Sequence, residues 1–504
     1  MCSFHFRVFA TLGASLALSA VLTRNVAAQS SAPAPSTITV RVGDTRQPIF
    51  GFGGSQTYAG DALADFPNRD AVYRALFQDL KIDIFRLRNY NAYPGEQDKF
   101  ERVTRDFAQG ALKWGGDSKT RGGKTPVRLM FTSWSPPPAL KSNNRISGRS
   151  DGTDKGQPSG TLKKDGAGKY VYNEFADWWL DSLQKFKSLS GVYPTYIALQ
   201  NELDFAATYE GCVFLPTEGT TSAGIALAGY DQALTTVSRR LTTALGAQSP
   251  KIVGPETFSL KTSPNDPNHV TKFIDPASPT GKEALSHLFG ISFHIYGAGA
   301  VGDEAVRNPQ LFQTALNQVR DAYRTAGVDK PLFQTEYLEG DSLTAVAGII
   351  NDTFTKGDAS AYLVWISARG VAGPGYGLVY FNPADGSIER RDRFYAVKAF
   401  SEYVGEGWNR VEAQCDNPDL KLSAYIGPAK RDLVVVLINP TNRPQRTTIT
   451  PDDSRFKNAK MDMHRSSEGE SGERWKDMGA FPSDGVISLL PRSVVTVRYT
   501  SNNP

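Results

Sequence analysis

Cysteine and histidine are scarce in this chain of 504 residues, which holds three cysteines and five histidines. Cys2 lies in an N-terminal leader pattern, so Cys212 and Cys415 remain, too few for the disulfide framework of a small secreted domain. We expect both to behave as small buried side chains. The histidines show no paired metal-ligand spacing, so we expect no metal and no other cofactor.

Long apolar runs and a strong net charge are also missing. After residue 28 no stretch approaches the roughly 18 uninterrupted apolar residues that a membrane-spanning helix needs. A formal net charge of +4 is too weak to indicate a nucleic-acid partner. Gly123-Lys124-Thr125 is similar to the end of a phosphate loop but precedes a predicted strand, and no Gly-x-Ser-x-Gly elbow occurs. We therefore expect no membrane, no nucleic acid and no serine-hydrolase chemistry.

The N-terminus has the pattern of a secretory signal. Arg7 precedes an apolar run at 8–22, and small residues at 26–28 offer a cleavage site before Gln29. We assign residues 1–28 to a signal peptide and residues 29–37 to a flexible lead-in. We expect a secreted or periplasmic monomer.

Strands and helices alternate from residue 48 to residue 408. Predicted strands lie at 82–88, 127–132, 195–200, 252–254, 291–295, 332–335 and 361–365, and predicted helices at 70–80, 172–186, 229–245, 309–326, 342–354 and 393–404. The glycine-dense segment 47–55 is predicted as a turn, and 141–170 as a long exposed loop. About eight strand–helix repeats indicate an α/β fold, a (β/α)8 TIM barrel over residues 48–408.

After residue 409 the predicted elements change from alternating strands and helices to strands alone. Short strands at 420–425, 433–438, 445–450 and 493–499 are separated by Pro, Asn and Gly without a strong helix. This pattern predicts an attached all-β sandwich over residues 409–504. The N-terminal strand at 38–47 has no evident partner in the barrel, so we expect it to join the sandwich.

Two of the predicted buried strands end on a glutamate, Glu202 and Glu336. By our count these strands are the fourth and seventh of the barrel, and the carboxyl ends of all eight strands meet at one face. Paired carboxylates in a cleft suit glycoside hydrolysis, in which one protonates the leaving oxygen and the other attacks or activates water. Asn201, next to Glu202, is placed to hydrogen-bond a sugar 2-hydroxyl.

Four aromatic residues fall at or just after predicted strand ends, namely Trp134, Tyr296, Trp365 and Tyr376. Their rings are suited to line the floor of a sugar-binding cleft. For any single ring, packing at the mouth of the barrel explains its position equally well. His294, near the end of another strand, is predicted to hold a carboxylate.

Several motifs occur in an order that resembles family 30 glycoside hydrolases over residues 38–500. They are Gly51-Phe-Gly-Gly54, Trp134-Ser-Pro-Pro137, Lys141-Ser-Asn-Asn144, Leu199-Gln-Asn-Glu202, Tyr209-Glu-Gly-Cys212, Phe293-His-Ile-Tyr-Gly297 and Thr335-Glu336. The resemblance implies a barrel with an attached β-sandwich and a retaining mechanism. By matching position, Glu202 would be the acid/base and Glu336 the nucleophile.

Within that family the chain looks most like the bacterial xylanases, which implies a secreted endo-β-1,4-xylanase acting on plant polysaccharide. Members that recognise glucuronate carry a tyrosine and a basic pair where this chain has Leu338 and Ala368-Arg369. Arg369 remains a candidate for contacting an acidic substituent. Other branches of the family cleave β-1,6-glucan or β-1,6-galactan, and these substrates stay open.

Two alternatives of other kinds also stay open. One is a non-catalytic carbohydrate-binding protein on the same scaffold. The other is a different barrel hydrolase that uses Asp204, Glu339 or Asp341 as its acid.

Overall fold

The computed structural model describes residues 34–58, 61–149, 160–260, 269–296, 309–338, 342–373, 375–479 and 482–501. The predicted signal peptide, most of the lead-in, Glu339 and Asp341 lie outside these residues. Among the described helices, none combines the length and apolar character that crossing a membrane requires.

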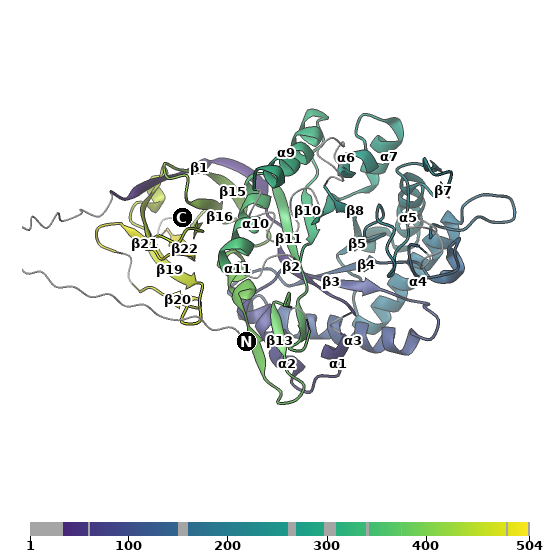
Figure 1. The fold of residues 1–504 in the computed structure, drawn as a ribbon, viewed down its shortest axis with the longest axis horizontal. Coiled ribbons are helices and arrows are strands. Elements are labelled where there is room, and N and C mark those ends of the chain that lie inside the picture. The colour runs from purple at the N-terminus through teal and green to yellow at the C-terminus, as the bar shows by residue number, and fades with distance from the viewer. Residues whose placement is uncertain are drawn as a thin grey trace, which may run out of the picture. The chain divides into compact units, whose positions relative to one another are not determined.

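Eight parallel strands close a barrel, which confirms the predicted fold class (Figure 1). In chain order they are β2 (Gly51–Gln56), β3 (Ile84–Asn89), β4 (Arg128–Ser133), β5 (Tyr196–Ala198), β8 (Lys251–Ser259), β9 (Gly290–Tyr296), β10 (Leu332–Glu336) and β11 (Ala359–Trp365). β11 pairs with β2 and so completes the ring. Glu202 follows the fourth strand and Glu336 ends the seventh, the places predicted for them, with β2 as the first strand where a turn was predicted.

Helices cover the outside of the barrel, and a separate apolar cluster fills its inside. The main helices are α2 (Arg69–Arg74), α3 (Gln97–Gly115), α4 (Tyr172–Ser190), α5 (Tyr230–Leu245), α9 (Pro309–Thr325), α10 (Leu343–Thr355) and α11 (Asp392–Ser401). The interior cluster includes Ile84, Met130, Val253, Phe333 and Leu363, all fully buried. The sequence analysis did not predict α3, although Phe100, Val103 and Phe107 recur at helical spacing and are buried on one face of it.

The glycine-dense segment 47–55 was wrongly predicted as a turn, because most of it forms barrel strand β2. Every residue of β2 is buried. A Cβ on Gly53 would lie 2.2 Å from the carbonyl oxygen of Ile84, and one on Gly54 would lie 2.5 Å from Ser367 Oγ. At Gly53 glycine is therefore required by the close approach of neighbouring backbone, and at Gly54 a Cβ would displace the Ser367 side chain.

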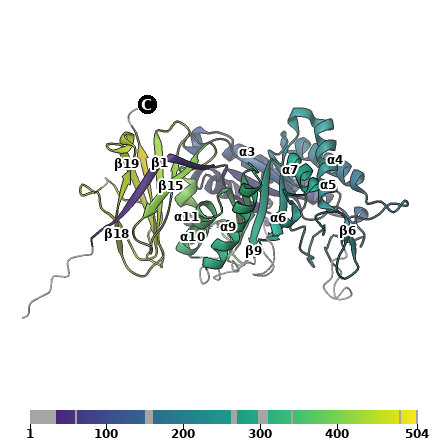
Figure 2. The ribbon, with the colours of Figure 1, turned by 90° about the horizontal axis from the view of Figure 1, so that it is seen from above.

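The C-terminal β region is an all-β domain attached to the barrel, as predicted, and its nine strands are joined in one mixed sheet. Its strand order is β20 (Lys476–Asp477), β19 (Lys460–Ser467), β22 (Ser493–Thr500), β17 (Asp432–Asn439), β16 (Lys421–Ile426), β15 (Asn409–Cys415), β1 (Ser36–Pro48), β18 (Gln445–Pro451) and β21 (Ile487–Leu489). β1 pairs antiparallel with β15 and parallel with β18. α10 packs on β16, β17 and β22, and α11 on β22 (Figures 1 and 2).

The segment predicted as an exposed loop at 141–170 is partly buried where the structure describes it. Lys141, Thr161 and Leu162 are each at most 2% exposed, and Lys141 bridges to Leu162. The Lys141 ammonium donates to Ser135 Oγ and to the carbonyl oxygens of Ile146 and Ser147. A buried lysine thus fixes this segment, a role that its Gly, Ser and Lys composition did not indicate.

Candidate active site

Arg86 of β3 is fully buried and joins side chains from five other strand ends. Its guanidinium donates hydrogen bonds to Ser55 Oγ at 3.1 Å, Thr132 Oγ1 at 3.2 Å, Asn201 Oδ1 at 2.6 Å, Glu256 Oε2 at 2.7 Å and Glu336 Oε2 at 2.7 Å. The guanidinium group is planar and permanently charged and has five N–H donors, so it can hold two carboxylates at fixed positions. Sequence reasoning missed Arg86, although an arginine inside the apolar strand 82–88 was an available signal.

Glu202 lies directly beyond β5, in a left-handed backbone conformation with φ of 50°. Its amide donates to the Glu256 carbonyl oxygen at 2.9 Å, which anchors the turn. Oε2 accepts a hydrogen bond from the Tyr209 hydroxyl at 2.8 Å, and Oε1 lies 3.1 Å from His294 Nδ1. His294 therefore contacts a carboxylate, as its position predicted, while the part played by Tyr209 was not predicted.

Glu336 is the last residue of β10 and is 5% exposed, as is Glu202. Its Oε2 accepts from Arg86, and its Oε1 accepts from the Tyr296 hydroxyl at 3.2 Å. One oxygen of each of these two glutamates and a ring nitrogen of His294 lie within 4.8 Å of one another. The barrel thus brings the two predicted carboxylates together.

A third carboxylate, Glu256 of β8, lies behind this pair and was missed. It is fully buried, accepts a hydrogen bond from Thr335 Oγ1, and its Oε2 lies 3.6 Å from His294 Nε2. Burial alone would raise its pKa, but the charges of Arg86 and His294 lower the pKa to about 2. The available signal was again positional, since Pro255-Glu256 follows the predicted strand 252–254.

The charges in the site are nearly balanced. Burial lowers the pKa of His294, but the carboxylates of Glu336, Glu202 and Glu256 outweigh burial and raise it to about 10. Burial also raises the pKa of Glu336, while His294 and Arg86 oppose that rise. Two cations therefore face three carboxyl groups. One further proton, held on one of the carboxyls, would make the cluster neutral.

Aromatic side chains form one wall of the site. The Arg86 guanidinium lies over the Trp134 ring at 4.5 Å, and the Trp365 ring centroid is 6.0 Å from that of Trp134. Tyr58 lies 6.1 Å from Trp134 and 6.3 Å from Trp365. Trp134 and Tyr296 are buried, whereas Trp365 is half-buried. Of the predicted aromatic residues Trp134, Tyr296 and Trp365, Trp365 is therefore the most exposed.

Arg369 and Tyr376 lie beside this wall, in the segment after β11. A small sheet of β12 (Ala368–Gly370), β13 (Val379–Phe381) and β14 (Ile388–Arg390) carries Arg369, whose guanidinium lies 4.5 Å from the Tyr376 ring centroid. Arg369 is buried, and its Nε and Nη1 have no hydrogen-bond partner among the described residues. The described contacts join this pair to each other and do not join their side chains to either glutamate.

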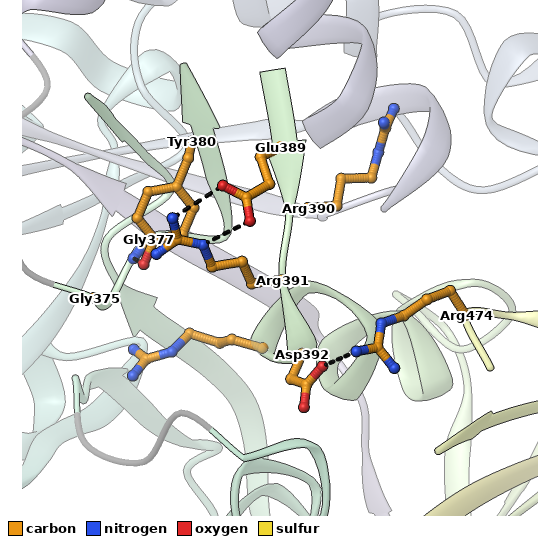
Figure 3. A pocket seen from close by; sticks show the side chains of 9 residues that line it. Gly375, Gly377, Tyr380, Glu389, Arg390, Arg391, Asp392 and Arg474 are labelled. Carbon is orange, nitrogen blue, oxygen red and sulfur yellow. Dashed lines mark hydrogen bonds and ion pairs between the residues drawn. The ribbon is translucent and has the colours of Figure 1, made fainter. Parts of the chain in front are cut away.

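A hollow of about 330 Å³ is lined in part by residues of β13, β14 and the start of α11 (Figure 3). Arg391 forms a two-pronged ion pair with Glu389 and stacks on Tyr380 at 3.9 Å, while Arg474 pairs with Asp392 at 2.7 Å (Figure 3). Arg393, also in its wall, donates to the carbonyl oxygens of Trp365 and Tyr376. Arg393 therefore holds the backbone at Trp365 and Tyr376 in place.

Asp204, one of the alternative acids, makes a different contact. Its Oδ1 accepts a hydrogen bond from the Phe258 amide at 2.7 Å, and burial raises its pKa to about 7. Arg86, which holds Glu336 and Glu256, makes no hydrogen bond to Asp204 in the described structure. Asp204 therefore joins the turn after β5 to the end of β8.

Comparison with protein-family models finds no match, and comparison of the sequence with curated proteins finds none either. Solved structures do match. A family 30 subfamily 8 xylanase from Clostridium acetobutylicum is 23% identical, with a TM-score of 0.66 over 92% of this chain and all of that chain.

Two further matches show the range of activities on this fold. The catalytic domain of a family 30 xylanase from Talaromyces cellulolyticus is 19% identical, with a TM-score of 0.66 over 92% of this chain and all of that one. An endo-β-1,6-glucanase is 17% identical, with a TM-score of 0.65 over 94% of this chain and 96% of that one. This chain has the fold of family 30 glycoside hydrolases, so the resemblance drawn from its motifs is confirmed at the level of fold.

Proposed function

We propose that this protein is a retaining glycoside hydrolase in which Glu202 is the acid/base and Glu336 the nucleophile. The observation that carries the proposal is the approach of these two carboxylates within 4.8 Å, with Arg86 and Asn201 beside them. Retaining enzymes place their carboxyl groups about 5–5.5 Å apart, whereas inverting enzymes need about 6.5–9.5 Å to admit a water molecule. The observed approach favours retention.

In the first step a Glu336 oxygen attacks the anomeric carbon while Glu202 gives its proton to the glycosidic oxygen. The bond between carbon and leaving oxygen breaks, and a glycosyl ester forms on Glu336. In the second step Glu202 takes a proton from water, and the water oxygen displaces Glu336. The hydrogen bonds from Arg86 and Tyr296 hold the Glu336 carboxylate in position for attack.

We propose β-1,4-xylan as the substrate and internal bonds as the point of cleavage. The motif order and the two xylanases of the same fold support this choice. β-1,6-Glucan is the second candidate, supported by the glucanase of the same fold and by Leu338 in place of a tyrosine. The N-terminal leader pattern supports secretion, with plant polysaccharide as the partner.

Reducing-sugar release from xylan, β-1,6-glucan and β-1,6-galactan tests the proposal. We expect the wild type to hydrolyse xylan fastest and the Glu336→Gln variant to hydrolyse none of the three measurably. Faster turnover of a β-1,6-linked chain would replace xylan as the substrate. Failure of the wild type on all three, with binding retained, would favour a carbohydrate-binding protein.

A further inference from the structure

Exposed apolar side chains gather beside Glu202. Among the described residues, four large apolar side chains are exposed, and three of them lie near Glu202. These are Ile146 at 36%, Phe205 at 37% and Tyr209 at 47% exposure. The Ile146 carbonyl accepts from the Gly211 amide, and the Tyr209 carbonyl accepts from the Gly148 amide, so the two segments adjoin. Such a patch, next to polar groups of a cleft, is typical of a ligand site.

The aromatic rings here form a row with one buried and one open end. Tyr296, which donates to Glu336, stacks on Phe258 at 5.3 Å, and Phe258 stacks on Phe205 at 4.6 Å. Tyr209 adjoins Phe205 at 6.3 Å and donates to Glu202. The buried end of the row therefore lies at the proposed nucleophile, and the exposed end lies at the proposed acid.

Hydrogen bonds hold the exposed end in place. The Asp204 carboxylate accepts from the Phe258 amide at 2.7 Å, which fixes Phe205 against Phe258. The Phe205 amide donates to the Glu202 carbonyl oxygen at 2.9 Å. Lys141 holds the Ser147 carbonyl at 2.7 Å on the neighbouring segment. A ring fixed in this way loses little conformational freedom when a ligand covers it.

We propose that the exposed rings of Phe205 and Tyr209, the Phe205–Tyr209 surface, bind a sugar ring on the leaving-group side of the scissile bond. The inference rests on the proposed function, because Glu202 protonates the oxygen that joins the leaving sugar. A pyranose ring has apolar C–H faces and hydroxyl groups at its edge, so it can cover an aromatic face while its hydroxyls stay in water. Because these rings lie at the exposed end of the row, the sugar that we place on them is one beyond the first leaving sugar. Filling the surface then needs at least two sugars after the scissile bond, which favours cleavage inside a chain over cleavage next to its reducing end.

Bond-cleavage frequencies on a linear pentasaccharide of the hydrolysed polysaccharide, labelled at its reducing end, test this proposal. We expect the Phe205→Ala variant to shift the preferred cleavage toward the reducing end and to raise KM for the polysaccharide about 10-fold. Phe205→Tyr should restore both values, because it keeps the ring. Val192→Ala is the matched control, since Val192 is 39% exposed and precedes the start of β5, at the opposite end of that strand.

Unchanged cleavage frequencies and KM in Phe205→Ala would overturn the inference and leave the proposed function standing. A loss of kcat without a shift in cleavage position would also overturn it, because it would indicate disturbed chemistry instead of a lost sugar contact. Absence of hydrolysis by the wild type would overturn both proposals together. Circular dichroism and the Tm of each variant would establish that it folds.

Discussion

Two buried ion clusters lie at the two ends of strand β3, and they differ in the balance of their charges. At the amino end, one carboxylate, Asp83, faces two cations, Arg121 at 3.2 Å and Lys124 at 3.0 Å. At the carboxyl end, three carboxyl groups face Arg86 and His294. One strand therefore carries a cation-rich cluster and a carboxylate-rich cluster.

Backbone carbonyl groups complete the cluster around Asp83. Lys124 donates to the carbonyl oxygens of Lys81, Ser401 and Val404 at 2.7–3.0 Å, and Arg121 donates to that of Phe77 at 2.8 Å. Each cation is satisfied by groups that do not titrate, so this cluster is suited to holding the chain together. The carboxyl-end cluster has a surplus of carboxylates instead, so it can take up and release a proton, as hydrolysis requires.

The largest expected contrast is in catalysis. We expect Glu336→Gln to lower kcat at least about 10⁴-fold, because the proposed nucleophile is lost, and Glu202→Gln, which removes the proposed acid/base, to lower it by about 10²–10⁴-fold. Neither change should lower the free energy of unfolding by more than about 1 kcal/mol, since Arg86 and His294 both keep Glu256 as a partner. Initial rates and urea unfolding of the purified variants measure both quantities. Near-normal kcat in either variant would refute its assigned role.

The opposite result is expected for Asp83→Asn. This change leaves Arg121 and Lys124 buried without an anionic partner and should cost about 3–5 kcal/mol of stability, while kcat of the folded protein stays within about 2-fold. Asp70→Asn is the control, because Asp70 pairs with Lys113 at the surface and should change stability by at most about 1 kcal/mol. Equal effects of the two substitutions would contradict a stabilising role for the buried cluster.

The pKa values of His294 and Glu256, both in the carboxyl-end cluster, predict a pH window of stability. The pKa of His294 rises from about 6.5 in the unfolded chain to about 10, so its contribution is full below pH 6.5 and is lost as pH rises toward 10. The pKa of Glu256 falls from about 4.5 to about 2, so its contribution is present above pH 4.5 and is lost as pH falls toward 2.

Urea unfolding of the wild type and of His294→Gln between pH 5 and pH 9.5 isolates the histidine. We expect the stability difference between them to shrink by at least about 1 kcal/mol as pH rises, since one pKa unit corresponds to about 1.4 kcal/mol. A difference that stays constant with pH would contradict the raised pKa of His294, because it would mean that folding leaves this pKa unchanged.

The smallest effect is expected from Tyr209→Phe, which removes one hydrogen bond to Glu202. Loss of one hydrogen bond to a charged group should lower kcat about 10-fold and leave stability nearly unchanged. Tyr230→Phe is the control, because the hydroxyl of Tyr230 is buried and has no hydrogen-bond partner among the described residues. Equal losses of kcat in both variants would show that the hydrogen bond from Tyr209 to Glu202 does not contribute to catalysis.

The barrel and its two principal glutamates could be predicted from the sequence because both depend on local pattern. Apolar strands that end on Glu202 and Glu336, counted along the chain, are enough to place both carboxylates at one face. Arg86 and Glu256 were missed because their partners come from strands far apart in the sequence, and closure of the barrel brings them together. The parallel pairing of β1 with β18 was missed for the same reason.

Chemical rescue with azide tests the roles of Glu202 and Glu336 most directly. The Glu336→Ala and Glu202→Ala variants would be given an activated aryl glycoside of the hydrolysed sugar, and the configuration of the glycosyl azide would be read by NMR. We predict that Glu336→Ala yields the azide of inverted configuration and Glu202→Ala the azide of retained configuration. The reverse pairing, or rescue of neither variant, would contradict the assignment of Glu336 as nucleophile and Glu202 as acid/base.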